Sequence, residues 1–174
     1  MRQTGVLGLI SVLVLAGLTG CSPATEGAIG VRLDAEGRLV AVLGWCQGEG
    51  TDTIILYRGN DDGAAIDEVL RLDRDPGRGD RTAEEIVLLD PGEGWQTKQT
   101  ASTLDTASVY DLRAWNTRGG KVRDFPFRIS ELNDQTGSNV ILTKQWEGED
   151  RGGYVAAFRT PEDFAHYADT MCGG

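Results

Sequence analysis

The sequence predicts an all-β protein: a β-sandwich followed by a C-terminal extension that ends in a short α-helix. Short segments of alternating or continuous apolar residues recur along the chain, and turn-forming Gly, Asn, Asp and Pro residues separate them. Only the last segment has the signals of a helix start. With 174 residues, 40% of them hydrophobic, the chain is long enough for one ordinary core and too short for two full domains.

The first strands follow from two kinds of pattern. Ile29, Val31 and Leu33 alternate with small or polar residues, and after a turn the mostly apolar run Leu39–Trp45 predicts an adjacent strand. The same signals predict six further strands and two shorter ones: Thr53–Arg58, Ile66–Leu72, Glu85–Leu89, Ser108–Asn116, Val122–Ile129 and Asn139–Gln145, with the shorter ones at Gly94–Lys98 and Tyr154–Phe158. Many short strands at this spacing favour a sandwich or barrel.

A helix is predicted over 161–172, at the end of the extension 131–174. Thr160 suits the N-cap and Pro161 the first helical position, and the two acidic residues that follow favour the positive end of the helix dipole. One face is apolar, formed by Phe164, Tyr167, Ala168 and Met171. We expect this face to pack on the sandwich.

Residues 1–20 have the pattern of an export signal. A short polar start with Arg2 precedes a run of thirteen apolar or small residues, too few for the roughly 20 that a membrane-spanning helix needs. The next residues, Leu18-Thr19-Gly20-Cys21, resemble the lipobox of bacterial lipoproteins. The resemblance implies a diacylglyceryl group on Cys21, cleavage before it and an extracytoplasmic domain anchored to the cell membrane, with 21–27 as lipidated Cys and flexible tether. A plain secretory signal with an unmodified Cys21 is the alternative.

The charge of the chain is strongly acidic, with 17 Lys+Arg against 27 Asp+Glu and a net charge of −10. This balance disfavours nucleic acid as a partner, since a phosphate backbone needs clustered Lys and Arg. It also predicts repulsion of an anchored domain from anionic headgroups. The basic residues are mostly Arg, which is a compositional hint of a GC-rich bacterium such as an actinobacterium.

The two cysteines other than Cys21 are Cys46 and Cys172. In an exported chain an even pair predicts one disulfide between them. Two buried free thiols are the alternative. The only histidine, His166, does not neighbour either cysteine, so a Cys/His nucleophile or a zinc site is poorly supported.

A pattern of apolar, polar and turn-forming residues surrounds Tyr110: Leu104, Tyr110, Leu112, Arg113-Ala114, Asn116 and Gly119-Gly120, with Ala41-x-Leu43-x-Trp45 and Ile55-x-Tyr57-Arg58 upstream. The segment around Tyr110 resembles the E–F corner and F strand of a fibronectin type III domain, and the upstream segments resemble its B and C strands. The resemblance covers about residues 28 to 130 and implies a fibronectin type III-like or immunoglobulin-like sandwich whose corner tyrosine bonds the nearby backbone.

The family register implies that Tyr110, Leu112 and Ala114 point inward. With Ile55 and Tyr57 also inward, alternation puts an apolar patch on the outer face of this sheet: Ile54, Leu56, Val109 and Trp115. Monomers seldom leave such a patch bare, so the extension is expected to cover it, or a partner to bind it. Trp95 and Trp146 lie in polar surroundings and are further candidates for an exposed surface that stacks on a glycan or binds a protein.

No motif for catalysis, cofactor binding or metal binding stands out. The acidic loop from Asp73 to Glu84 has three arginines and lacks the ligands of a calcium loop. The sequence therefore predicts no catalytic residue, cofactor or metal, and a membrane-anchored, non-catalytic binding module of the cell envelope. A small extracytoplasmic hydrolase using carboxylates, and a structural accessory subunit of a membrane or secretion complex, are the alternatives.

Overall fold

A computed structural model describes residues 25–46, 50–60, 65–75, 83–148 and 153–172. It contains eleven strands in these ranges, one 3₁₀-helix and one α-helix. In chain order they are β1 (Thr25–Leu33), β2 (Leu39–Trp45), β3 (Thr53–Gly59), β4 (Ala65–Asp73), β5 (Ala83–Val87), β6 (Gln96–Thr100), β7 (Val109–Trp115), β8 (Lys121–Arg123), β9 (Pro126–Arg128), η1 (Ile129–Gln135), β10 (Ile141–Trp146), β11 (Tyr154–Arg159) and α1 (Pro161–Thr170). The all-β prediction with a C-terminal helix is confirmed.

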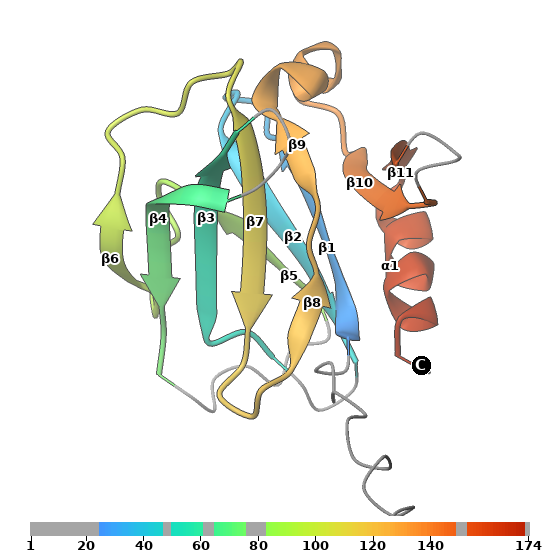
Figure 1. Ribbon diagram of the computed structural model, residues 1–174, viewed down its shortest axis with the longest axis horizontal. Coiled ribbons are helices and arrows are strands. Elements are labelled where there is room, and N and C mark those ends of the chain that lie inside the picture. The colour runs from blue at the N-terminus through green and yellow to red at the C-terminus, as the bar shows by residue number, and fades with distance from the viewer. Residues whose placement is uncertain (1–24, 47–49, 61–64, 76–82, 149–152, 173–174) are drawn as a thin grey trace, which may run out of the picture.

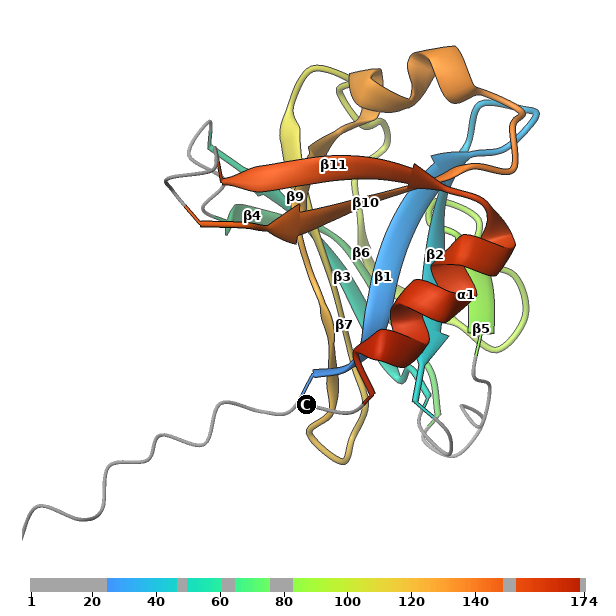
Figure 2. The ribbon, with the colours of Figure 1, turned by 90° about the vertical axis from the view of Figure 1, so that its right-hand side faces the viewer.

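The strands form one sheet that curls into two facing layers (Figure 1). β1, β2 and β5 make one layer, and β3, β4, β7 and β9 make the other, with β6 at its outer edge. A parallel contact between β1 and β8 joins the layers, and the β10–β11 hairpin extends the sheet beyond β1 (Figure 2).

The main core lies between the layers. β2 shows how the sequence builds it, because every residue of this strand is buried. Its odd-numbered residues, such as Leu43 and Trp45, point into the main core, whereas Val40 and Val42 face the opposite way. A strand covered on both faces has a continuous apolar run, which is the pattern of Leu39–Trp45.

α1 covers the outer face of β1 and β2. Thr160 caps it, since its Oγ1 accepts the backbone N–H of Asp163, as the sequence predicts. The helix ends at Thr170, two residues before the predicted end. Phe164, Tyr167 and Ala168 form a second apolar cluster with Ala28, Val40, Val42 and Ile141. The extension therefore packs on the sandwich, but on the layer of β1 and β2.

Two glycines allow this close packing. A Cβ added at Gly44 would lie 2.5 Å from the Ala168 Cβ, and one added at Gly30 would lie 2.3 Å from Ile141 Cγ2. Both distances are far inside van der Waals contact. The bare backbone of the two strands thus forms the surface on which the helix and β10 rest.

The tyrosine corner forms at the start of β7. Tyr110 is buried, and its hydroxyl hydrogen-bonds the backbone of Asp105, five residues upstream, while burial raises the pKa of Tyr110. Leu104 packs against the main core nearby. The same corner holds Asp105, whose carboxylate accepts bonds from the Ser108 hydroxyl and the Ala107 N–H, which lower its pKa.

Two sequence predictions need correction at the level of single elements, and one element has no counterpart among the predictions. The predicted strand Val122–Ile129 is divided into β8 and β9, and the 3₁₀-helix η1 was not predicted. β1 begins at Thr25, inside the expected tether 21–27, because Thr25 pairs with Lys121 and Gly27 with Trp45. Residues 1–24, with Cys21, lie outside the described residues.

Candidate interaction surface

The exposed apolar side chains gather on the β10–β11 hairpin. Five large hydrophobic residues are exposed within the described ranges, and all but Leu89 belong to this hairpin: Trp146, Tyr154, Val155 and Phe158. Trp146 keeps 48% of its surface exposed and Phe158 47%. Monomeric proteins seldom leave several such side chains together in water.

Three of these residues share one face of the hairpin. Trp146 is opposite Tyr154 in the ladder, and their rings meet edge to face with centroids 5.1 Å apart. Phe158 lies four residues beyond Tyr154 and so points to the same side. We call Trp146, Tyr154 and Phe158 the aromatic hairpin surface.

Contacts of β10 with the rest of the fold hold the aromatic hairpin surface in place. Lys144 lies on the same face of β10, and its Nζ is 2.8 Å from Oε1 of Glu131 in η1. Leu142, opposite Phe158, is fully buried in the main core. The end of the hairpin that holds Phe158 is thereby fixed to the sandwich, while the other end presents the Trp146 and Tyr154 rings to solvent.

β11 is an edge strand, which adds a second binding property. It stands at the end of the strand order and pairs only with β10 among the described strands. Five successive apolar residues, Tyr154–Phe158, run along this edge. The other end of the order, β6, is wholly exposed and polar with Lys98 at its centre, which is how proteins usually protect an edge against strand addition.

The predicted patch on the β3–β7 layer does not exist. Ile54 and Leu56 are fully buried in the main core, and Val109 is buried too. Ile54 pairs with Ala114 and Leu56 with Leu112, so the inward assignment for β7 is correct but β3 is shifted by one residue. β3 takes this orientation because the residues that pair with it on the outer face are charged, and charged side chains favour a face exposed to solvent.

The outer face of β3 and β7 carries an ion-pair network instead of an apolar patch. Arg113 lies over the Tyr57 ring, with its guanidinium 5.0 Å from the ring centroid. It also bridges Asp111, at 2.5 Å, and Asp124, at 3.2 Å. Asp111 is only 5% exposed, and burial raises its pKa although Arg113 opposes this.

The remaining predicted tryptophans are partly covered. Trp115 is half-buried. Trp95 packs against the main core, and the guanidinium of Arg74 lies 4.5 Å from its ring centroid. Arg74 in turn forms a bidentate ion pair with Glu84. Of the six tryptophan and aliphatic residues predicted for a surface, Trp146 is the one whose side chain is largely exposed.

Sequence reasoning missed Tyr154, Val155 and Phe158 as surface residues. Their run reads as a buried strand, because apolar continuity alone does not distinguish the centre of a sheet from its edge. The available signal was the acidic and glycine-rich stretch between Trp146 and Tyr154, which indicates a hairpin tip with aromatic residues on both sides.

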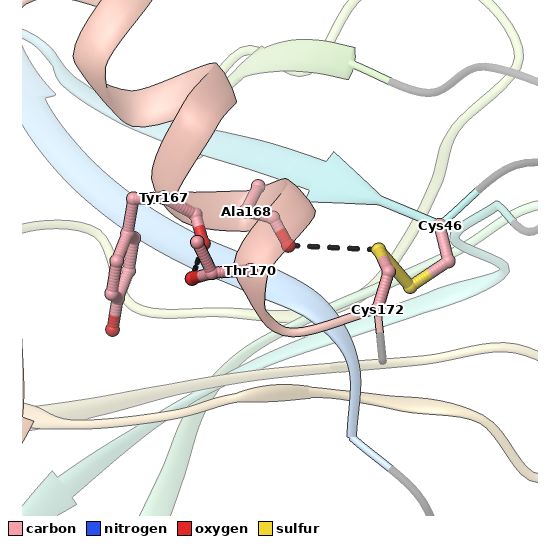
Figure 3. Close-up of a disulfide and its surroundings, with 5 residues drawn as sticks. All are labelled: Cys46, Tyr167, Ala168, Thr170 and Cys172. Carbon is pink, nitrogen blue, oxygen red and sulfur yellow. Dashed lines mark hydrogen bonds between the residues drawn. A yellow bond between two sulfur atoms is a disulfide. The ribbon is translucent and has the colours of Figure 1, made fainter. Parts of the chain in front are cut away.

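The predicted cysteine pair is brought together at the end of β2. Cys46 and Cys172 form a disulfide with their Cα atoms 5.4 Å apart (Figure 3). Cys172 follows the last turn of α1, where its Sγ lies 3.6 Å from the carbonyl oxygen of Ala168 and Thr170 bonds the carbonyl of Tyr167. The bond ties the helix to the layer that it covers.

In the described ranges no group of three or more His, Cys, Asp and Glu side chains could hold a metal ion. The Asp73–Glu84 loop falls partly outside those ranges. No helix among the described residues is long and apolar enough to cross a membrane.

Comparison with known protein families, with characterised proteins and with solved structures found no match for this chain.

Proposed function

We propose that this chain is a membrane-anchored extracytoplasmic lipoprotein whose β-sandwich binds a protein of the cell envelope without catalysing a reaction. The observation that carries the proposal is the aromatic hairpin surface on an unprotected edge strand. Aromatic residues are the commonest anchors of protein interfaces.

The lipid anchor on Cys21 is supported by the export signal and the lipobox-like residues that precede it. The disulfide between Cys46 and Cys172 is compatible with an oxidising compartment outside the cytoplasm. Two acyl chains on one residue would hold the domain stably at the membrane.

A fibronectin type III-like or immunoglobulin-like fold is supported by the strand pairing. Labelled in sandwich order, β1, β2 and β5 correspond to A, B and E, and β4, β3, β7 and β9 to C′, C, F and G. The tyrosine corner at Tyr110 agrees with this assignment. Such domains are common scaffolds for binding surfaces, and a fold alone does not specify the partner.

A protein partner fits the hairpin better than a glycan does. Sugar rings stack on aromatic faces, but they do not use the backbone edge of a strand. Among the described strands β11 pairs with β10 on one side only, and it carries apolar side chains on both faces, which suits an extended segment that adds as a further strand.

The carboxylate pair of Asp111 and Asp124 is a candidate for the hydrolase alternative. Asp111 and Asp124 lie near each other, and the pKa of Asp111 is raised, as a general acid needs. Arg113, however, occupies the space between the two carboxylates and bonds both. A substrate would have to displace this arginine, so the network serves the fold.

The proposal is tested by co-purification from solubilised native membranes. Trp146→Ser and Tyr154→Ser are each expected to weaken the partner's affinity about 30-fold, the effect of losing an interface anchor. Leu89→Ser is the matched control, since Leu89 is equally exposed but lies after β5.

Two results would contradict the proposal. Equal recovery of the partner with all three variants would exclude the hairpin as the binding surface. Binding of the wild type to isolated cell-wall polysaccharide, lost in Trp146→Ser, would assign the surface to a glycan instead.

A further inference from the structure

The backbone of β11 has one side turned away from β10. The Glu147 N–H donates to the carbonyl of Gly153 across the hairpin. Bonded pairs alternate with non-bonded pairs along an antiparallel ladder, so Gln145 and Val155 form the next bonded pair. The N–H and C=O of Ala156, the residue after Val155, therefore point to the side of β11 that no other described strand occupies.

The residues of β11 have the same chemical character when the strand is read in either direction. Tyr154 and Phe158 are the aromatic ends, and Val155 and Ala157 flank the central Ala156. In an antiparallel pair of two β11 strands with the Ala156 residues opposite each other, Tyr154 meets Phe158 of the second copy, and Val155 meets its Ala157. The strand is thus self-complementary, as a two-fold interface requires.

This register joins the aromatic hairpin surfaces of the two copies. Trp146 is opposite Tyr154 within one hairpin, so Phe158 of the second copy extends the row to three adjacent rings. The two-fold axis repeats the row, and the small Ala156 side chains lie between the two rows. Aromatic pairs across neighbouring strands are favourable, and here they would cover rings that each copy exposes to water.

Charge favours β11 as the place where two copies meet. Each chain has a net charge of −10, so two copies repel each other overall. No residue from Tyr154 to Phe158 is charged. Arg159 would lie opposite Gly153, so no like charges face each other between these positions.

The hairpin is oriented so that both copies can stand on one membrane. β10 and β11 run across the direction of β1 (Figure 2), whose first residue, Thr25, is separated from Cys21 by three residues. The two-fold axis of strands that pair edge to edge is normal to the plane of their sheet. This axis therefore runs roughly along β1, and rotation about it leaves the start of β1 at the same end in both copies.

The contact is small, which makes the lipid anchor part of the inference. The three rings of the aromatic hairpin surface are each nearly half exposed, so at about 200 Å² per ring they offer roughly 300 Å² per copy. A specific dimer that is stable in solution buries about 1,200 Å² or more in total. Two copies anchored in one membrane have a higher effective concentration, so a smaller contact is sufficient.

We propose that two lipid-anchored copies of this chain pair through β11, antiparallel and centred on Ala156, and so form a continuous sheet with one aromatic face. The inference rests on the proposed function, because it identifies the partner of the aromatic hairpin surface as a second copy. It also rests on the proposed lipid at Cys21.

The test uses the full chain, produced in a bacterium that processes lipoproteins and reconstituted into vesicles at low density. Ala156→Cys places two thiols opposite each other, because Cα atoms of a bonded antiparallel pair are about 5.5 Å apart, which a disulfide can span. Val155→Cys is the register control, since its two copies would lie about 8 Å apart, too far for a disulfide. Lys98→Cys, on the edge strand β6, controls for chance collisions.

We expect copper-catalysed air oxidation to link Ala156→Cys chains into a species of twice the mass, and to link few chains of either control. Adding Phe158→Ser or Tyr154→Ser to Ala156→Cys should slow the linkage about 10-fold, because the two-fold axis removes their contact twice. Leu89→Ser, equally exposed, should leave the rate unchanged. Excess detergent, which gives each chain its own micelle, should abolish the linkage. Thermal unfolding checks the fold of each variant, and mass spectrometry reports the lipid on Cys21.

The inference would be overturned if Ala156→Cys were linked no faster than Val155→Cys or Lys98→Cys. Equal linkage in vesicles and micelles would overturn it too. If a different protein then co-purifies from native membranes and is lost with Trp146→Ser, the proposed function stands without the inference, and if none does, both fail. A chain without lipid on Cys21 would overturn the anchor, and the inference with it.

Discussion

The contact between α1 and the bare backbone of β2 gives a sharp prediction. In Gly44→Ala the new methyl group would lie 2.5 Å from the Ala168 Cβ and 3.4 Å from the Phe164 ring. Neither neighbour is the mobile end of a long side chain, so the helix itself must move away. Inserting a methyl group into a packed core typically costs 1–3 kcal/mol, and we expect about 2 kcal/mol here.

A double-mutant cycle tests this contact, and its second variant removes the methyl group of Ala168, on the helix side. Ala168→Gly alone should cost about 1 kcal/mol, because glycine is the poorer helix former. In the double variant the clash disappears, so its loss should be smaller than the sum of the single losses by at least about 1 kcal/mol. Urea unfolding of the four proteins with the disulfide intact measures this coupling.

The reasoning would be refuted if Gly44→Ala were as stable as the wild type. It would also be refuted if the two losses simply added, since the helix would then not rest on Gly44.

Three further predictions concern stability. Replacing both Cys46 and Cys172 by Ser should lower the free energy of unfolding by up to about 5 kcal/mol, because the bond spans a sequence separation of 126. Urea unfolding of the double variant, and of the wild type with and without reductant, checks this. An unchanged midpoint would contradict it. Burial raises the pKa of Asp111, so its contribution to stability is greatest at low pH and falls as the pH rises from the ordinary aspartate pKa of 3.8 through the raised pKa. Asp111→Asn should therefore gain in stability relative to the wild type as the pH rises above 3.8, measured by urea unfolding at a series of pH values. A difference independent of pH would contradict this. Trp146→Ser should leave the unfolding free energy within about 0.5 kcal/mol of the wild type, as for other exposed sites, and a larger loss in urea would show that the residue supports the fold.

Local signals explain why most elements could be predicted. In Ile29–Leu33 the large apolar residues alternate because they face the main core, while Gly30 on the other face lies under Ile141 and Phe164; continuity in Leu39–Trp45 is produced by large apolar residues on both buried faces. The start of α1 follows from the side chain of Thr160, which acts within one turn. The disulfide follows from the cysteine count and an exported setting.

Non-local contacts explain what could not be predicted. Four successive apolar residues, Ile54–Tyr57, fit either orientation of β3, and only the charged partners across the ladder decide between them. The surface covered by α1 depends on Gly30 and Gly44, whose importance appears once helix and strands are placed together.

The candidate surface was predicted only in part. Trp146 was identified from the polar residues after it. The exposure of Tyr154 and Phe158 follows from the place of β11 at the end of the strand order, which is a property of the whole sheet.

Site-specific crosslinking in living cells tests the central claim most directly. A benzophenone amino acid in place of Val155 lies on the edge of β11 and leaves the aromatic hairpin surface intact, and one in place of Lys98 on β6 is the control. We predict a discrete membrane-protein adduct at position 155 that disappears with Trp146→Ser, and none at position 98. No adduct at 155, or the same adducts at both positions, would contradict the account.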